Sequence, residues 1–349
     1  MDVNRRDVIE IAVAAAMVAF AAIAHFADAT PVLTFALAAL AIAVLARLVG
    51  GATEQLGGRV GPSAAGVVQS ALGNLPELFI SLFALREGLI EVVQSALVGS
   101  VLANSVLVLG LAFLVGGIRN GTQRFDSPRA RAIATLSVLA AAILSVPTLA
   151  DTFHAPAAAH ERTLSLICAG VLLILFLLTL PGFLRDPTGE HQEAQPRWSL
   201  ALTIAVLGGA GVAAAFVSDW FVSALEPATD ALGMSQAFAG LVVVAIAGNA
   251  VENVVGVQLA ARNRPDFAIS VIVNSALQVA LLLTPILVFA SLFMATTLTL
   301  AFPTLLAIAL LLGAGIAALV VYDGESTWEE GAILIGLYVV IAASFWWGS

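Results

Sequence analysis

The stretch SALGNLPELFISL, residues 70–82, places an amide, a proline and a carboxylate inside a long apolar segment. These residues are Asn74, Pro76 and Glu77. An ionisable side chain at such a position is costly, and it is usually retained because it serves a function. We therefore expect Glu77 to serve a function that the rest of the sequence indicates.

A second stretch, VAIAGNAVENVVGV at residues 244–257, repeats this pattern 175 positions later. The correspondences are Gly73 with Gly248, Asn74 with Asn249 and Glu77 with Glu252. The same offset continues into the next apolar segment, where Ser95 corresponds to Ser270 and Ser100 to Ser275. Because one register holds at rare polar residues across two consecutive segments, we interpret it as an internal repeat.

The composition indicates a membrane protein. Of the 349 residues, 60% are hydrophobic and 11% are charged, and the mean hydropathy is +1.03. A soluble protein has about 25% charged residues, so we expect lipid to cover most of this surface. The net charge of −9 comes from 23 acidic and 14 basic residues. No basic patch suggests nucleic acid as a partner.

A transmembrane helix needs about 20 mostly apolar residues, and the chain offers eleven candidate spans. They are approximately 7–25, 31–48, 61–86, 92–116, 130–150, 163–184, 199–222, 236–262, 267–290, 299–321 and 329–347. The first resembles a signal peptide, but a second span follows almost at once, so we expect it to be retained. Twelve of the arginines fall in loops on the N-terminal side and two on the other. This bias predicts a cytoplasmic N-terminus and, with eleven spans, an outer C-terminus.

The repeat predicts an inverted architecture. Glu77 lies in the third span and Glu252 in the eighth, so the two copies cross the membrane in opposite directions. We predict an all-α polytopic membrane protein with eleven transmembrane helices, one extra helix and two inverted five-helix repeats. The expected divisions are an extra helix at 1–28, a first repeat at 29–185, a cytoplasmic linker at 186–198 and a second repeat at 199–349.

Polar side chains near the middle of these spans form the candidate site. Asn and Glu three positions apart share one helix face in both copies, and the following spans add Ser100 with Asn104 and Ser275 with Gln278. The candidate metal ligands are Glu77, Glu252, Asn74, Asn249, Ser100, Asn104, Ser275 and Gln278. We expect helix breaks at Gly73, Pro76 and Gly248, because proline lacks an amide proton and frees a carbonyl.

These groups form a set of hard oxygen ligands, which suits Ca²⁺ better than Zn²⁺ or Cu. Two buried carboxylates cannot remain charged and unpaired, so they need a dication, monovalent cations or protons. If these occupants exclude one another, the site exchanges a cation for protons. Glu77 and Glu252 are then the proton carriers, and no further cofactor is required.

The motifs resemble those of the Ca²⁺/H⁺ antiporters of the cation-exchanger family, within the calcium/cation antiporter superfamily. GNLPE (73–77) and GNAVE (248–252) look like its Gly-Asn-x-x-Glu repeats, and GSVLANSVLVLG (99–110) looks like the segment that follows. The resemblance implies an exchanger that exports cytosolic Ca²⁺ against H⁺ by alternating access. It implies that Glu77 and Glu252 bind Ca²⁺ or protons. We expect the protein in a prokaryotic cell (inner) membrane.

Three alternatives remain open at this stage. A Na⁺-coupled calcium/cation exchanger would share the architecture, although such exchangers tend to have Thr, Ser and Pro around the second acid, where this chain has Asn249 and Val251. A passive cation channel would conduct without proton coupling. An intramembrane enzyme is disfavoured, because the chain has no HExxH or GxSxG motif.

Overall fold

The computed structural model describes residues 4–60, 73–184 and 197–348, and these residues are almost entirely helical. They divide into two compact units. Unit 1 comprises the chain up to Phe83 together with Phe176–Leu232, and unit 2 comprises Ala84–Leu175 and Gly233 onward. The helices α4 (Leu75–Arg86) and α8 (Glu161–Leu184) each contribute to both units.

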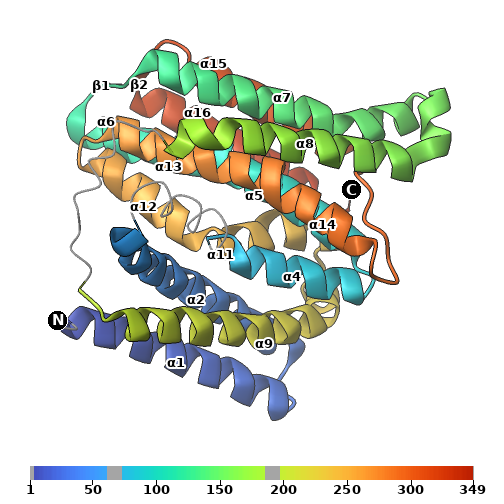
Figure 1. The fold of residues 1–349 in the computed structure, drawn as a ribbon. Helices are drawn as coiled ribbons and strands as arrows, with labels where there is room; N and C mark the ends of the chain where they lie inside the picture. Colours follow the sequence, from blue (N-terminus) through green and yellow to red (C-terminus); the bar gives the residue numbers. More distant parts are fainter. Residues whose placement is uncertain (1–3, 61–72, 185–196, 349) are drawn as a thin grey trace. The chain divides into compact units, whose positions relative to one another are not determined.

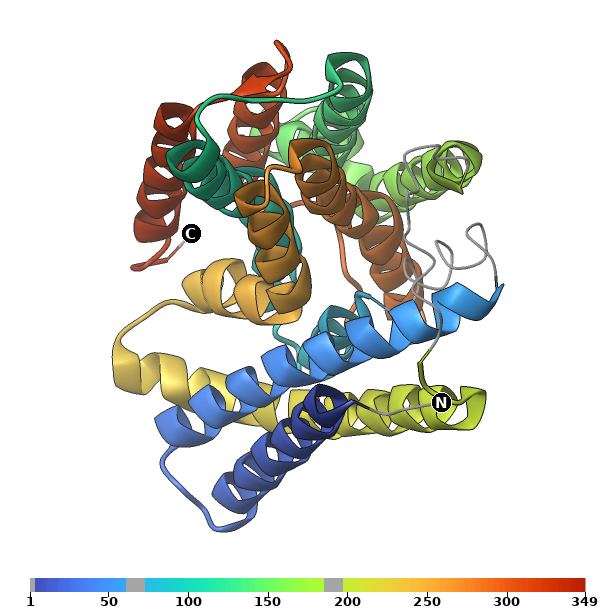
Figure 2. The ribbon, with the colours of Figure 1, turned by 90° about the vertical axis from the view of Figure 1, so that its left-hand side faces the viewer.

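Unit 1 is built on three long helices, α1 (Arg5–Phe26), α2 (Pro31–Val60) and α9 (Leu200–Leu232). All three lie side by side in both views (Figures 1 and 2), with α1 and α2 in blue and α9 in yellow-green. The seam between α2 and α9 is apolar, and there Phe35 stacks on Phe221 with ring centroids 4.7 Å apart. Small and branched residues follow at helical spacing, so the two helices pack closely along much of their length.

Two of these helices are longer than predicted. The helix α2 continues to Val60, past the predicted end at 48, and α9 continues to Leu232, past the predicted end at 222. In α2 the added turns contain Ala, Thr, Glu, Gln and Leu, which a helix accommodates, and the Thr53 hydroxyl donates to the Val49 carbonyl at 2.8 Å. Loss of hydrophobicity marked the membrane boundary in the sequence, but the helical backbone does not end there.

Unit 2 contains the remaining elements. In chain order they are α5 (Ile90–Leu102), η1 (Ala103–Val108), α6 (Leu109–Asn120), β1 (Gln123–Arg124), α7 (Ser127–Thr152), η2 (Pro156–His160), α10 (Gln236–Phe238), η3 (Ala239–Val244), α11 (Ala245–Gly248), α12 (Ala250–Ala261), α13 (Pro265–Gln278), η4 (Val279–Leu283), α14 (Thr284–Ser291), α15 (Thr304–Val320), β2 (Glu325–Ser326) and α16 (Trp328–Ser344). The helix α6 packs along α16, α7 along α15, and α5 crosses η3. The segments η1, η3 and η4 are π-helical.

The crossing of α5 and η3 depends on two glycines. A Cβ atom on Gly99 would overlap the backbone of Leu241, and one on Gly240 would lie 2.5 Å from the carbonyl oxygen of Val92. Real Cβ atoms essentially never approach so closely, so any larger residue would push the two backbones apart. The two glycines therefore let segments from the two predicted repeats touch.

Polar contacts tie the turns of unit 2 together at two ends. At one end β1 pairs antiparallel with β2, and the Gln123 amide donates to the Ala260 carbonyl at 3.0 Å. At the other end the Gln94 amide donates to the Thr299 carbonyl at 3.0 Å, and the Leu300 N–H donates to the Ser165 hydroxyl at 2.9 Å. The two-residue ladder of β1 and β2 departs from the all-α prediction, because two turns that are distant in sequence satisfy their backbone groups by pairing.

Helix boundaries recur at one offset along the chain. Leu75 and Ala250 begin α4 and α12, and these positions are 175 apart. Ile90 and Pro265 begin α5 and α13 with the same separation. The π-helical segments η1 and η4 follow α5 and α13, so the irregular turn also recurs. The offset found in the sequence therefore also relates the starts of these helices.

Among the described residues, seven helices are long and apolar enough to cross a membrane. A bent pair, Gln236–Gly248 with Asn253–Ala261, would make an eighth, and α15 is a shorter apolar helix. The N-terminal half of the predicted span 61–86 falls at residues 61–72, outside the described part of the chain. The count of eleven spans stays a prediction.

Candidate ion-binding site

The first predicted motif lies at the beginning of α4 in unit 1. Gly73 and Asn74 form a turn, and the helix begins at Leu75, with the Leu78 N–H donating to the Asn74 carbonyl at 2.9 Å. Pro76 occupies the second helical position, where its missing N–H costs no intrahelical hydrogen bond. The carbonyl of residue 72, which we expected Pro76 to free, lies outside the described residues.

Glu77 is the acidic residue of the first turn of α4, and only 3% of it is exposed. Asn74 is 6% exposed, and its Nδ2 has no hydrogen-bond partner within the described chain. A carboxylate in the first turn interacts favourably with the helix dipole. The start of α4 therefore places a buried carboxylate and a buried amide within one turn of each other.

The second motif breaks its helix without a proline. The helix α11 ends at Gly248, Asn249 adopts φ −100° and ψ 20°, and α12 begins at Ala250. The helical segments on either side are bent by 62°. The Asn249 side chain donates to the Ala245 carbonyl at 2.9 Å, which satisfies a backbone acceptor at the bend. Glu252 is the third residue of α12, and its side chain lies outside the described part of the structure.

Four of the predicted ligands meet in a hydrogen-bond network within unit 2. The Asn249 amide nitrogen donates to the Ser100 hydroxyl at 3.1 Å. The Asn249 amide oxygen accepts from Asn104 Nδ2 at 3.1 Å and from the Ser275 hydroxyl at 3.3 Å. All four residues are at most 4% exposed. The sequence pattern therefore selected side chains that the fold brings together from three separate segments.

The amide of Asn104 has a defined orientation in this network. Its Nδ2 donates to the Ser100 carbonyl at 3.0 Å as well as to Asn249, which uses both amide hydrogens. Its Oδ1 is buried and has no hydrogen-bond partner within the described chain. An unpaired buried acceptor costs about 1–3 kcal/mol unless a water molecule or an ion satisfies it. The Oδ1 of Asn104 is an oxygen suited to a cation.

The other predicted ligands come from both units. Gln278 is the last residue of α13, directly before η4, and it is half-buried. Asn74 and Glu77 belong to unit 1. Asn104 itself lies in η1, and π-helical turns inside α-helices occur frequently at functional sites.

The sequence analysis did not predict the role of Gly240 or the π-helical turns. The small size of the residue at position 240 was the available signal for a close helix crossing.

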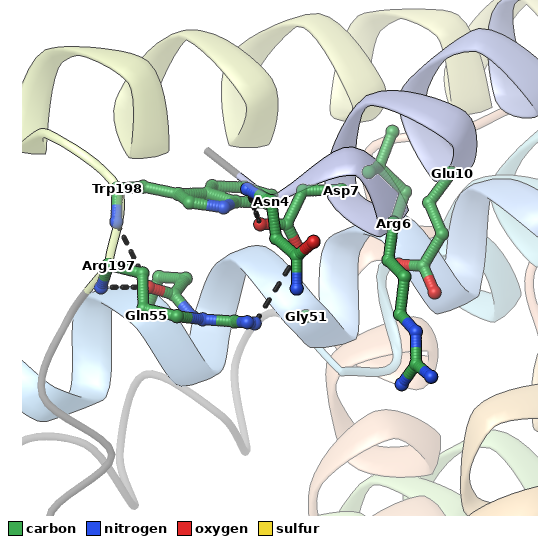
Figure 3. A pocket seen from close by; sticks show the side chains of 9 residues that line it. Asn4, Arg6, Asp7, Glu10, Gly51, Gln55, Arg197 and Trp198 are labelled. Atoms are coloured by element: carbon green, nitrogen blue, oxygen red, sulfur yellow. Dashed lines mark hydrogen bonds and ion pairs between the residues drawn. The ribbon is translucent and has the colours of Figure 1, made fainter. Parts of the chain in front are cut away.

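A separate polar cavity of about 260 Å³ lies in unit 1 at the N-terminal end of α1 (Figure 3). Gln55 accepts hydrogen bonds there from the backbone N–H groups of Arg197 at 2.8 Å and Trp198 at 3.3 Å. The Arg197 guanidinium lies 3.5 Å from the buried Asp7 carboxylate. Arg59 donates to the Trp198 carbonyl. These contacts fasten the segment that leads into α9, and the described lining includes none of the predicted ligands.

Comparison with known proteins identifies the family. Residues 30–184 and 202–347 match the family described as sodium/calcium exchanger protein. This chain is a member of that family. Its apolar helices and its exchanger relatives make this exchanger-family chain an integral membrane protein.

Relatives of this exchanger-family chain match over nearly its whole length. It is 34% identical to the Ca²⁺/H⁺ antiporter ChaA of Bacillus subtilis (strain 168), over 89% of this chain and 91% of the relative. It is 33% identical to a Ca²⁺/H⁺ antiporter of Aphanothece halophytica, over 92% of each chain. Its fold is similar to the structure of native YfkE, with a TM-score of 0.84, 30% identity and coverage of 97% of this chain and 99% of that one. The resemblance predicted from the motifs is confirmed.

Proposed function

We propose that this chain is a secondary antiporter that exports cytosolic Ca²⁺ in exchange for protons by alternating access. Relatives that match over nine-tenths of the chain carry the name Ca²⁺/H⁺ antiporter, which favours protons over Na⁺ as the coupling ion. The names of these relatives describe transporters, which agrees with the expectation that the chain is not an enzyme. Ca²⁺ and H⁺ are its substrates, and it needs no other cofactor.

The burial of Glu77 carries this proposal. A carboxylate that is 3% exposed at the start of a helix is costly to keep charged, which favours its neutralisation by a cation or a proton. We propose that Glu252, at the matched position of α12, supplies the second carboxylate. Two carboxylates balance one Ca²⁺ or two protons, so binding either occupant expels the other. That mutual exclusion makes the site an exchanger.

The remaining oxygens come from the polar residues around the two motifs. Ca²⁺ takes six to eight oxygen ligands and accepts amide, hydroxyl and carboxylate donors. We propose that the amide and hydroxyl side chains supply or position these oxygens. The residues are Asn74, Asn249, Ser100, Asn104, Ser275 and Gln278. The unpaired Oδ1 of Asn104 is the described atom that supports this assignment most directly.

The proposed architecture is one extra helix and two inverted repeats of five helices. Its support is the 175-residue separation of the starts of α4 and α12 and of α5 and α13. The two family-matched segments, 30–184 and 202–347, also lie one on each predicted repeat. Inverted repeats are a common basis for alternating access, with the substrate site at their interface. We propose the divisions 1–28, 29–185, 186–198 and 199–349 on this basis.

The proposed orientation places the N-terminus in the cytoplasm and the C-terminus outside. The contacts at the ends of unit 2 support the alternation of spans that this requires. The turns near Gln123, Ala260 and Glu325 share one end, and each is a predicted cytoplasmic loop. The turns near Ser165 and Leu300 share the other end, and both are predicted outer loops.

Calcium uptake into inverted membrane vesicles tests this function. An acidic vesicle interior should drive ⁴⁵Ca²⁺ uptake in vesicles that contain the protein, and dissipating the pH gradient should stop the uptake. An outward Na⁺ gradient at fixed pH should drive none. Uptake that is driven by the Na⁺ gradient and is independent of the pH gradient would establish a Na⁺-coupled exchanger instead. Ca²⁺ flux that depends on neither gradient would indicate a channel.

A further inference from the structure

The two motif asparagines occupy different environments although they are equivalent in the sequence. Asn249 uses its full hydrogen-bonding capacity, since an asparagine amide offers two donors and two acceptor sites. Its nitrogen donates to Ser100 and Ala245, and its oxygen accepts from Asn104 and Ser275. Asn74, by contrast, has a buried Nδ2 with no partner within the described chain.

The hydrogen bonds of Asn249 determine which atom of Asn104 is available. Asn104 directs both amide hydrogens away from its Oδ1, one to the Ser100 carbonyl and one to Asn249 Oδ1. If the bond to Asn249 were lost, the contact with Ser100, on the same helical segment, would be the only described hydrogen bond holding the amide. The amide could then rotate, and its Oδ1 would no longer be presented in one direction.

We propose that Asn249 is a positioning residue, which keeps the Oδ1 of Asn104 free and oriented for the transported cation instead of giving its own oxygen to that cation. The inference rests on the proposed function and refines it. The oxygen of Asn249 already accepts hydrogen bonds from Asn104 and Ser275, so using it as a ligand would require breaking at least one of them. The motif of Asn249 then differs in role from that of Asn74, because Asn249 acts through Asn104, a residue of the first predicted repeat.

A double-mutant cycle on the Ca²⁺ concentration for half-maximal uptake (KM) tests this proposal. Removing an outer partner of a metal ligand typically costs about 10–100-fold in affinity. Asn249→Ala and Asn104→Ala should therefore each raise KM by about tenfold or more. In the Asn104→Ala background, adding Asn249→Ala should change KM by no more than about threefold, because the residue it positions is already absent. Ser145→Ala, which removes a buried hydroxyl of α7 that donates to the Ala141 carbonyl outside the network, is the matched control and should leave KM unchanged.

The outcomes separate the two proposals. Absence of proton-driven uptake by the wild-type protein would overturn the proposed function itself. Wild-type uptake with an unchanged KM in Asn249→Ala, or with a further rise above about threefold in the double variant, would overturn the positioning role alone. If Asn249→Ala is not recovered as a monodisperse protein, the cycle is run with Asn249→Ser, whose hydroxyl is too short to span the 3.1 Å contact with Asn104.

Discussion

The side-chain oxygen of Asn249 accepts a 3.1 Å hydrogen bond from the amide nitrogen of Asn104, which precedes it by 145 positions in the chain. Both residues are fully buried. A hydrogen bond in such low-dielectric surroundings is strong when satisfied and costly when broken. The contact therefore fixes the geometry at the point where segments of the two predicted repeats meet.

Replacing Glu77 with Gln should reduce proton-driven Ca²⁺ uptake to the level of empty vesicles. The amide keeps the shape of the side chain but can neither bind a proton reversibly nor contribute a negative charge to a dication. Glu87→Gln is the matched control, because Glu87 is exposed and lies 3.7 Å from Arg86, and it should transport like the wild type. The assignment of Glu77 is wrong if its Gln variant transports Ca²⁺ at the wild-type rate.

Replacing Gly99 with Ala should destabilise the protein. The added methyl group would overlap the backbone of Leu241, so α5 and η3 would have to separate. Overpacking of this kind costs about 1–3 kcal/mol, which should lower the apparent Tm of the purified protein in detergent. The matched control is Gly170→Ala in α8, where a Cβ would meet nothing within 4 Å. Equal Tm values for the two variants would contradict the close helix crossing.

Replacing Gln55 with Leu should also lower the apparent Tm, while the KM for Ca²⁺ stays the same. The change removes the acceptor for the backbone N–H groups of Arg197 and Trp198 and leaves the Trp198 N–H unpaired in a buried setting. An unpaired buried group costs about 1–3 kcal/mol. Glu10→Gln, which breaks an exposed ion pair with Arg47, should change stability by at most about 1 kcal/mol. A shifted KM with an unchanged Tm in Gln55→Leu would show that the cavity serves transport.

Single cysteines should report the sidedness of the two ends of unit 2. In a Cys168→Ala background, Thr122→Cys should react with a membrane-impermeant maleimide in inverted vesicles but not in intact cells. Ala295→Cys should show the reverse, because its turn lies at the opposite end, where Thr296 donates to the Leu85 carbonyl. Both positions are exposed. Labelling of both cysteines from the same side would contradict the predicted alternation of spans.

The sequence allowed the family and most of the polar network to be predicted, because rare polar residues stand out in an apolar chain. The register of Asn74 with Asn249 and of Ser100 with Ser275 identified four buried polar residues. Three of them, Asn249, Ser100 and Ser275, belong to the hydrogen-bond network. A helical period places Ser100 and Asn104 on one face, so their proximity follows from local geometry. The family resemblance rests on these same residues.

Other features depend on tertiary contacts that no local pattern contains. The hydrogen bonds of Asn249 reach residues on two other segments, and the sequence does not indicate which of its atoms each one uses. The π-helical segment η3 lies where α5 crosses it, and the importance of Gly240 appears only once α5 lies against it. The sequence did not predict the extended ends of α2 and α9. The end of a hydrophobic run indicates the membrane boundary, but a helix can continue beyond that boundary with polar residues.

The central claim is that the buried carboxylates hold either Ca²⁺ or protons, and Ca²⁺ binding to the purified protein at different pH values tests it most directly. Calorimetry in buffers of different ionisation enthalpy counts the protons released per Ca²⁺ bound. We predict that affinity falls as the pH is lowered, because protons compete for the carboxylates, and that release approaches about two protons per Ca²⁺ at low pH. Ca²⁺ affinity that is independent of pH, with no protons released, would contradict the account.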